Sequence, residues 1–233
     1  RIKNNKITFY HIHNPDHFEY ANFLRNFPQS KVLYIIRNPI QMIESWIASD
    51  FKKLQITTDS NKSNQLYERI VGKIYYPFEF LNNPLNSIFK NQIRGIKLED
   101  IKRHPKKVIP LISEWIGIKD HFSLYKSEFM NKKYSRPSHN FDAISGFDLS
   151  AIDVKVGRFF GKKDIRILET LMWPLLEIFK YNNISESEFK KNLIEITPLL
   201  HQPLEFESKL KNYITDNKKY NIVIAASKKL HQH

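Results

Sequence analysis

The sequence predicts an α/β fold in which a three-layer parallel sheet is flanked by helices. Residues 31–36 form a nearly continuous apolar run with β-branched and aromatic side chains, which is typical of a strand buried on both faces. Residues 93–98 have a second strand-like pattern, and apolar residues at helical spacing follow each of the two runs. Strands that alternate with helices indicate a parallel sheet with right-handed crossovers.

A further strand is predicted near the start of the chain. Residues 6–15 alternate and are rich in aromatic side chains, which predicts a strand. Residues 16–27 predict a short helix that leads into the strand at 31–36. His13 then lies at the end of one strand and Arg37 at the end of the next, so both side chains can reach one cleft.

The strand at 31–36 is predicted to turn directly into a helix. Asn38 is of a type that caps helices, and Pro39 suits the first helical turn, where a missing N–H costs little. Three isoleucines at helical spacing predict that one face of this helix is buried against the sheet: Ile40, Ile43 and Ile47. Polar residues from 50 to 64 predict a loop after it.

Arg37 is therefore predicted at the carboxyl end of a strand and beside a helix N-terminus. Open α/β sheets bind ligands at this edge, and helix N-termini favour anions. Ser45 follows two turns later on the same helix. A guanidinium and a hydroxyl so placed can hold a phosphate from two sides. The alternative is an arginine that merely ends a strand and a serine on an ordinary amphipathic helix.

The run Tyr34-Ile-Ile-Arg37-Asn-Pro39, with Ser45 eight residues after the arginine, resembles the 3′-phosphate-binding motif of sulfotransferases that use 3′-phosphoadenosine 5′-phosphosulfate (PAPS). The resemblance implies a P-loop NTPase-like sulfotransferase fold. It also implies PAPS as co-substrate, with Arg37 and Ser45 as ligands of its 3′-phosphate.

The same resemblance implies that a strand-end histidine, some two dozen residues before the arginine, is the general base. His13, which is 24 residues before Arg37, matches this position. Imidazole suits the role because it can accept the proton of an attacking hydroxyl near neutral pH. The alternative for His13 is a structural bond to the backbone at the strand end.

The segment from Leu98 to Gly117 resembles the family's strand, Glu-Asp pair, proline, helix and glycine. Leu98 stands where the family usually has a tyrosine that contacts the nucleotide. Pro105 is predicted to open a helix that ends at Gly117. Glu99 and Asp100 are expected either to anchor the cleft or only to complement the charge at a helix N-terminus.

Lys155 and Arg158 are further candidates for binding the nucleotide. They belong to a Gly-Arg-aromatic element followed by a helix predicted over residues 162–181, which resembles the closing segment of bacterial sulfotransferases. The Arg-Lys-Gly triplet of the cytosolic relatives does not occur here. Residues 121–150 are polar and predict a long loop, which in a compact domain is often a functional lid.

The composition limits the classes of partner. The formal net charge of +13 favours a nucleotide, an acidic substrate, nucleic acid or a membrane surface, although many basic residues lie beside acidic ones. The absence of cysteine excludes disulfides, thiolate metal sites and cysteine catalysis, and it fits a cytoplasmic location. No apolar run approaches the ~20 residues that a transmembrane helix needs.

Residues 1–183 are predicted to form the sulfotransferase-like domain, and residues 184–233 a helical C-terminal extension. The family's Pro-Lys-x-Gly-Thr-type loop, which holds the 5′-phosphosulfate, is not found and would precede residues 6–15. The chain begins with Arg1, so we expect a domain truncated at its N-terminus, without its first strand and phosphosulfate loop. Such a fragment is expected to show negligible turnover by itself.

The leading hypothesis is an enzyme that transfers a sulfuryl group from PAPS to a hydroxyl or amine acceptor without a metal. Its predicted partners are the nucleotide and a hydroxyl-bearing acceptor, while the identity of the acceptor and a homo-oligomeric state are left open. A nucleotide kinase or phosphotransferase is the second hypothesis, and it requires magnesium with an acidic ligand. A non-enzymatic basic domain, the third hypothesis, predicts salt-sensitive binding to nucleic acid, but the sequence holds no recognisable nucleic-acid motif.

Overall fold

The computed structural model describes residues 8–10, 17–54, 65, 85–126, 128–129, 132–133, 146–150, 152–182 and 184–211. Its helices and strands, in chain order, are α1 (His17–Asn26), β1 (Val32–Ile36), α2 (Pro39–Leu54), α4 (Leu85–Ile88), β2 (Ile93–Lys97), α5 (Leu98–Arg103), α6 (Pro105–Ile116), the 3-10 helix η1 (Phe122–Tyr125), β3 (Glu128–Phe129), β4 (Lys132–Lys133), α7 (Lys162–Leu171), α8 (Trp173–Ile178), α9 (Glu186–Ile196), the 3-10 helix η2 (Thr197–Leu199) and α10 (Glu205–Lys211). The described chain is thus mixed α/β and mostly helical, which confirms the predicted class.

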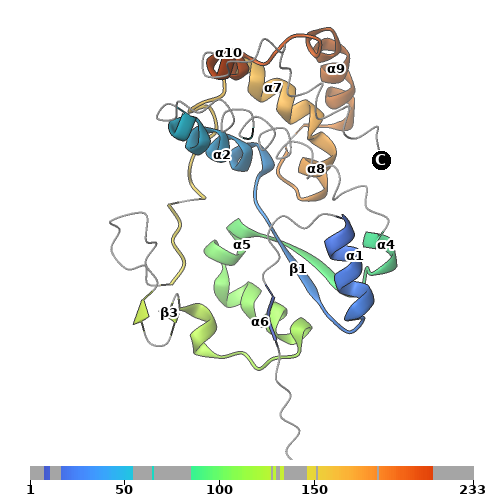
Figure 1. Cartoon of the computed structure of the whole chain (residues 1–233), viewed down its shortest axis with the longest axis vertical. Coiled ribbons are helices and arrows are strands. Elements are labelled where there is room, and N and C mark those ends of the chain that lie inside the picture. The colour runs from blue at the N-terminus through green and yellow to red at the C-terminus, as the bar shows by residue number, and fades with distance from the viewer. Residues whose placement is uncertain are drawn as a thin grey trace, which may run out of the picture.

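The described elements fall into two parts. Figure 1 shows α1, β1, β2, α5 and α6 together, and we call these elements the sheet half. At the other end of the molecule lie α2 and α7 to α10, which we call the helical half. The described strands form two separate pairs, β1 with β2 and β3 with β4, rather than one larger sheet.

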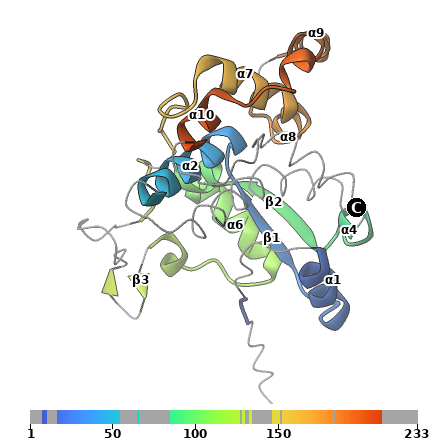
Figure 2. The ribbon, with the colours of Figure 1, turned by 45° about the horizontal axis from the view of Figure 1, so that its top comes forward.

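The parallel pair of β1 and β2 is the centre of the sheet half. Val32 lies opposite Ile93 and Ile36 opposite Lys97, and the two strands run side by side in Figure 2, which confirms two of the three predicted strands. Of the third, predicted over residues 6–15, only residues 8–10 are described, and they form no strand. The prediction that β1 is buried on both faces is wrong, because Ile35 is 60% exposed. Successive side chains of a strand point to opposite faces, and the described elements leave the face of Ile35 open.

The turn from β1 into α2 forms as predicted. The side chain of Asn38 accepts a hydrogen bond from the backbone N–H of Gln41 at 3.1 Å, which is the capping bond expected at a helix start. Pro39 is the first residue of α2. The helix continues to Leu54, so residues 50–54 of the predicted loop are helical, and the rest of that loop lies outside the described residues.

The main apolar core belongs to the helical half. The three isoleucines on the inner face of α2 are buried: Ile40, Ile43 and Ile47. They pack among the other helices of the helical half and not against the sheet, as had been predicted, because α2 lies beside α7 (Figure 1). The other members of this core are Phe160, Ile167, Leu168, Met172, Leu176, Ile196, Leu204 and Phe206. One face of α2 therefore joins the N-terminal and C-terminal parts of the chain.

The helix predicted over residues 162–181 is two helices. α7 ends before Met172 and α8 begins at Trp173. Pro174 explains the break, because proline has no N–H to continue the helical bonds and its ring clashes with the preceding turn. The Trp173 ring stacks on Phe189 of α9, with ring centroids 4.4 Å apart, so the short α8 is fixed to its neighbour.

α6 begins at Pro105 and ends before Gly117, as predicted. Gly117 has a φ of 86°, and its N–H donates to carbonyls of the last helical turn. α5, directly after β2, was not predicted. Trp115 on α6 has the cationic groups of Lys31 and Arg94 at 5.7 and 5.8 Å from its ring centroid, which ties α6 to the starts of both strands.

The region after residue 183 is helical where it is described. At the start of α10, the buried side chain of Asp164 accepts hydrogen bonds from the backbone N–H groups of Glu205 at 2.6 Å and Phe206 at 2.9 Å. Ile196 and Phe206 belong to the same core as α2. The domain boundary predicted at residue 183 stays a prediction.

The segment predicted as a loop over residues 121–150 contains η1 and the antiparallel pair of β3 and β4. Among the helices of the described chain, none combines the length and the apolar character that crossing a bilayer requires.

Candidate functional site

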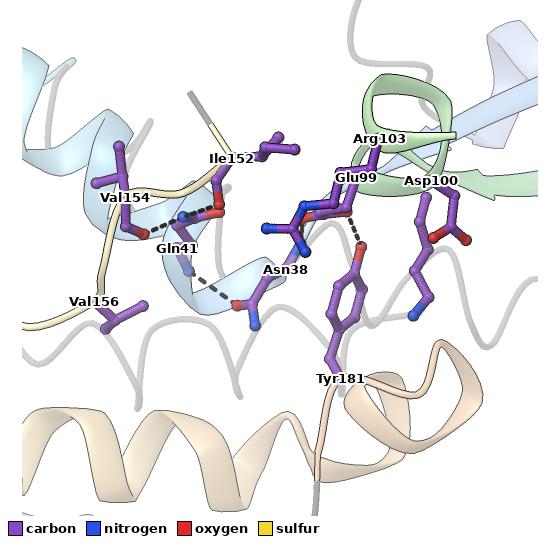
Figure 3. Close-up of a pocket in the computed structure, with 10 residues that line it drawn as sticks. Asn38, Gln41, Glu99, Asp100, Arg103, Ile152, Val154, Val156 and Tyr181 are labelled. Atoms are coloured by element: carbon purple, nitrogen blue, oxygen red, sulfur yellow. Dashed lines mark hydrogen bonds between the residues drawn. The ribbon is translucent and has the colours of Figure 1, made fainter. Parts of the chain in front are cut away.

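An open pocket of about 350 Å³ lies where the carboxyl ends of β1 and β2 meet the start of α2. Its polar residues are Asn38, Gln41, Lys97, Glu99, Asp100 and Arg103. Figure 3 shows Gln41 with Ile152, Val154 and Val156 on one side of the pocket, and Glu99 with Tyr181, which follows α8, on the other. The carboxyl edge of parallel strands is where α/β proteins place their ligands, so this pocket is the candidate site.

Glu99 joins three elements around the pocket. One of its carboxylate oxygens accepts from the backbone N–H of Asn38 at 3.3 Å, and the other accepts from the Tyr181 hydroxyl at 2.6 Å (Figure 3). Burial and this hydrogen bond raise the pKa of Tyr181, so its hydroxyl stays protonated and donates. Glu99 therefore anchors the cleft, as the first of the two alternatives for the Glu-Asp pair predicted, while Asp100 is exposed on the pocket wall.

Gln41 fixes the opposite side of the pocket. Its side chain is 5% exposed, and its amide nitrogen donates to the carbonyls of Ile152, at 3.2 Å, and of Val154. Its amide oxygen accepts from Nε of Arg37 at 2.9 Å. One buried amide thus orients the guanidinium of Arg37 and holds the apolar wall.

Arg37 lies directly after β1, at the predicted position. Burial lowers its pKa, Glu99 raises it, the nearby charge of Arg158 lowers it and Tyr181 raises it. An arginine starts from so high a pKa that it stays charged at neutral pH. Arg37 therefore keeps its positive charge, and the bond from its Nε to Gln41 fixes where that charge lies.

The remaining predicted site residues are less central. Ser45 is half-buried on α2, and Lys155 is exposed between Val154 and Val156. None of the four predicted nucleotide ligands belongs to the described lining of the pocket: Arg37, Ser45, Lys155 and Arg158. His13, the predicted base, lies outside the described residues. Leu98 is half-buried at the start of α5.

Comparisons with known proteins find no relative. No protein-family model matches the chain, and neither a curated protein nor a solved structure matches it. The function must therefore be inferred from the motif and from the geometry of the pocket.

Most residues that line the pocket were not recognised in the sequence, among them Gln41 and Tyr181. Gln41 stands among the apolar residues of α2, and a polar residue within an apolar face is a signal of a buried hydrogen bond. Tyr181 gave no such signal, because its partner Glu99 is far away in the sequence.

Two cations, two carboxylates and an apolar wall give the pocket a mixed chemistry. Lys97 and Arg103 can attract an anionic group, while the wall opposite can contact a flat apolar one. Among the described residues, no group of three or more His, Asp or Glu side chains could hold a metal ion. The expectation of metal-free chemistry stays a prediction.

Proposed function

We propose that this chain is the nucleotide-binding part of a PAPS-dependent sulfotransferase, which transfers a sulfuryl group to a hydroxyl or amine acceptor. One observation carries the proposal: Arg37 stands at the carboxyl end of β1, directly before the capped start of α2, with the charge of Arg158 nearby. Asn38 of the motif lines the pocket, and Arg37 is the residue directly before it, which supports a phosphate site beside the pocket.

Side chains, more than backbone groups, would bind this phosphate. The first turn of α2 has few backbone donors to offer, since the N–H of Asn38 is bound to Glu99, Pro39 has none and the N–H of Gln41 is bound to Asn38. The α2 dipole still favours negative charge at this end. Guanidinium groups supply the strong, charge-assisted hydrogen bonds that a phosphate needs.

The rest of the pocket is suited to the nucleoside. Ile152, Val154 and Val156 offer an apolar surface for a base, and the polar wall opposite offers partners for a ribose. We further propose the complete P-loop-like sulfotransferase fold around this site, with a three-layer sheet. Within it, His13 would accept the proton of the acceptor and Ser45 would assist Arg37 at the 3′-phosphate.

The test is calorimetric titration with adenosine 3′,5′-bisphosphate and, for comparison, adenosine 5′-monophosphate. We expect the bisphosphate to bind more tightly and Arg37→Ala to lose about tenfold to a hundredfold in its affinity, as expected for a charged hydrogen-bonded contact. The matched control is Arg94→Ala, which removes an exposed arginine of the same sheet beside Trp115 and should leave the affinity unchanged.

Equal binding of the two nucleotides by the folded chain would contradict the proposal. Tight, salt-sensitive binding of nucleic acid without any preference for the bisphosphate would instead favour a basic nucleic-acid-binding domain.

A further inference from the structure

Glu44 of α2 is a fully buried carboxylate that makes hydrogen bonds to one short turn of the chain. Its side chain is 0% exposed. One oxygen accepts from the backbone N–H groups of Gly157 at 3.0 Å, Phe159 at 2.7 Å and Phe160 at 3.0 Å, and the other oxygen lies 3.2 Å from Gly157 N. A buried charge is costly unless it is satisfied in this way, so this turn and Glu44 stabilise each other.

The shape of the turn directs one side chain away from the core. Gly157 has a φ of 103°, which residues with a Cβ rarely adopt. Phe159 and Phe160 point inward, with Phe160 3% exposed and its ring centroid 5.0 Å from that of Phe206. Arg158, between them and the glycine, is 51% exposed, and its Nε lies 4.0 Å from Glu44.

The turn thereby places Arg158 near Arg37. Gln41, whose amide oxygen accepts from Nε of Arg37, lies about one turn before Glu44 on α2, and Nε of Arg158 lies 4.0 Å from Glu44. The two buried side chains of α2 therefore hold both arginines on the same side of the helix, and after burial the charge of Arg158 also lowers the pKa of Arg37. Neither arginine belongs to the described lining of the pocket, but two arginines held near each other beside it are suited to a shared anion.

We infer that Glu44 is a positioning residue, which holds the turn 157–160 so that Arg158 and Arg37 act together on one phosphate of the nucleotide. This inference rests on the proposed function and deepens it. Glu44 does not touch the ligand. Its role is to fix the position of Arg158, and through Arg158 the preference for a nucleotide that carries a 3′-phosphate.

The test compares three single variants and one double variant by titration with adenosine 3′,5′-bisphosphate and with adenosine 5′-monophosphate. Glu44→Gln keeps the size of the side chain but removes its charge and replaces one acceptor oxygen with a donor. We expect the affinity for the bisphosphate to fall about tenfold, as for the loss of one charge-assisted contact, and the affinity for the monophosphate to stay unchanged.

Asp164→Asn is the matched control. Asp164 is also 0% exposed and also accepts backbone N–H bonds, but it holds the start of α10. Both variants should unfold at lower urea concentration than the original chain. Only Glu44→Gln should change the ratio of the two affinities, and all titrations are made where circular dichroism shows the variant to be folded.

Arg158→Ala completes the design. Arg158→Ala should lose the same preference as Glu44→Gln, and the double variant should lose no more than either alone, because both changes remove one interaction. A folded Glu44→Gln that keeps the full preference while Arg158→Ala loses it would overturn the role of Glu44 and leave the proposed function intact. An original chain without preference for the bisphosphate would overturn the proposed function, and this inference with it.

Discussion

The two halves of the molecule are stabilised in different ways. In the helical half, large side chains such as Phe206, Leu168 and Ile43 are 0% exposed. The sheet half buries fewer apolar side chains: Leu24 of α1 is 0% exposed and Ile109 of α6 is buried, but α5 contributes no buried residue and Ile35 of β1 is 60% exposed. Around the pocket, the sheet half is instead held by polar contacts, among them those of Glu99.

This difference shows where the site obtains its rigidity. Burying one large apolar side chain stabilises a fold by about 1.5–3 kcal/mol, whereas one hydrogen bond contributes about 0.5–1.5 kcal/mol net. α2 connects the two halves, because its start forms part of the pocket and its apolar face lies in the helical core. Gln41 and Glu44, both buried on α2, therefore connect the site to the more stable half.

The largest expected effect is loss of the helical core. Phe206→Ala should lower the free energy of unfolding by about 3–5 kcal/mol, since it removes a buried aromatic side chain and leaves a cavity. Ile35→Ala, on the exposed face of β1, should cost less than about 1 kcal/mol. Urea unfolding of both variants checks the comparison, and similar losses for the two would contradict it.

A smaller effect is expected at the contact between the halves. Tyr181→Phe removes the hydroxyl that donates to Glu99 at 2.6 Å and should cost about 1–2 kcal/mol, because a carboxylate loses a partner. Tyr125→Phe is the matched control, since Tyr125 donates to Asp120 at 2.9 Å in a setting open to solvent. Its loss of stability should be smaller. If urea unfolding shows the same loss of free energy of unfolding for both variants, burial does not strengthen the hydrogen bond from Tyr181 to Glu99.

The sheet half should respond to alkaline pH through Tyr34. Burial raises the pKa of this tyrosine from 10.0 to about 12, so the folded state keeps a proton that the unfolded state releases. The stability that the buried, protonated Tyr34 contributes is fully present below pH 10 and is lost as the pH rises from 10 towards 12. Tyr34→Phe should lose less stability across this range than the original chain, as measured by urea unfolding at each pH. Parallel losses would show that Tyr34 is not protected by burial.

The smallest effect is expected from an ion pair on the rim of the pocket. Nη2 of Arg103 lies 2.5 Å from Asp153, but the two side chains are 50% and 57% exposed. Arg103→Gln should therefore change the free energy of unfolding by less than about 1 kcal/mol, and less again at high salt. A larger, salt-independent loss in urea unfolding would show that polar contacts of the rim stabilise this region as strongly as apolar burial does.

Local signals in the sequence predicted the local structure well. The turn at Asn38-Pro39 and the helix from Pro105 to Gly117 are set by residues whose backbone preferences act within a few positions. The sequence also showed that Ile43 lies on an apolar face of α2. It did not show which surface that face would meet, because an apolar face fits a sheet or a helix equally well.

The candidate site was predicted in part, for the same reason. Arg37 lies where predicted because a strand end and a helix start are adjacent in the sequence, and Arg158 was nominated through the family resemblance. That the two bind a nucleotide stays a prediction. The bonds from Glu44 to the turn after Val156, and from Tyr181 to Glu99, join residues far apart along the chain. Such partners are fixed by tertiary packing, which no local pattern reveals.

The positions of the tryptophans allow the unfolding of each half to be followed by fluorescence. The chain has three, and Trp115 lies beside two cations in the sheet half while Trp173 is stacked on Phe189 in the helical half. Replacing Trp46 of α2 by phenylalanine would leave one indole in each half, in two different surroundings. The fluorescence of the two indoles would then show whether both halves unfold in one transition or whether the sheet half unfolds first.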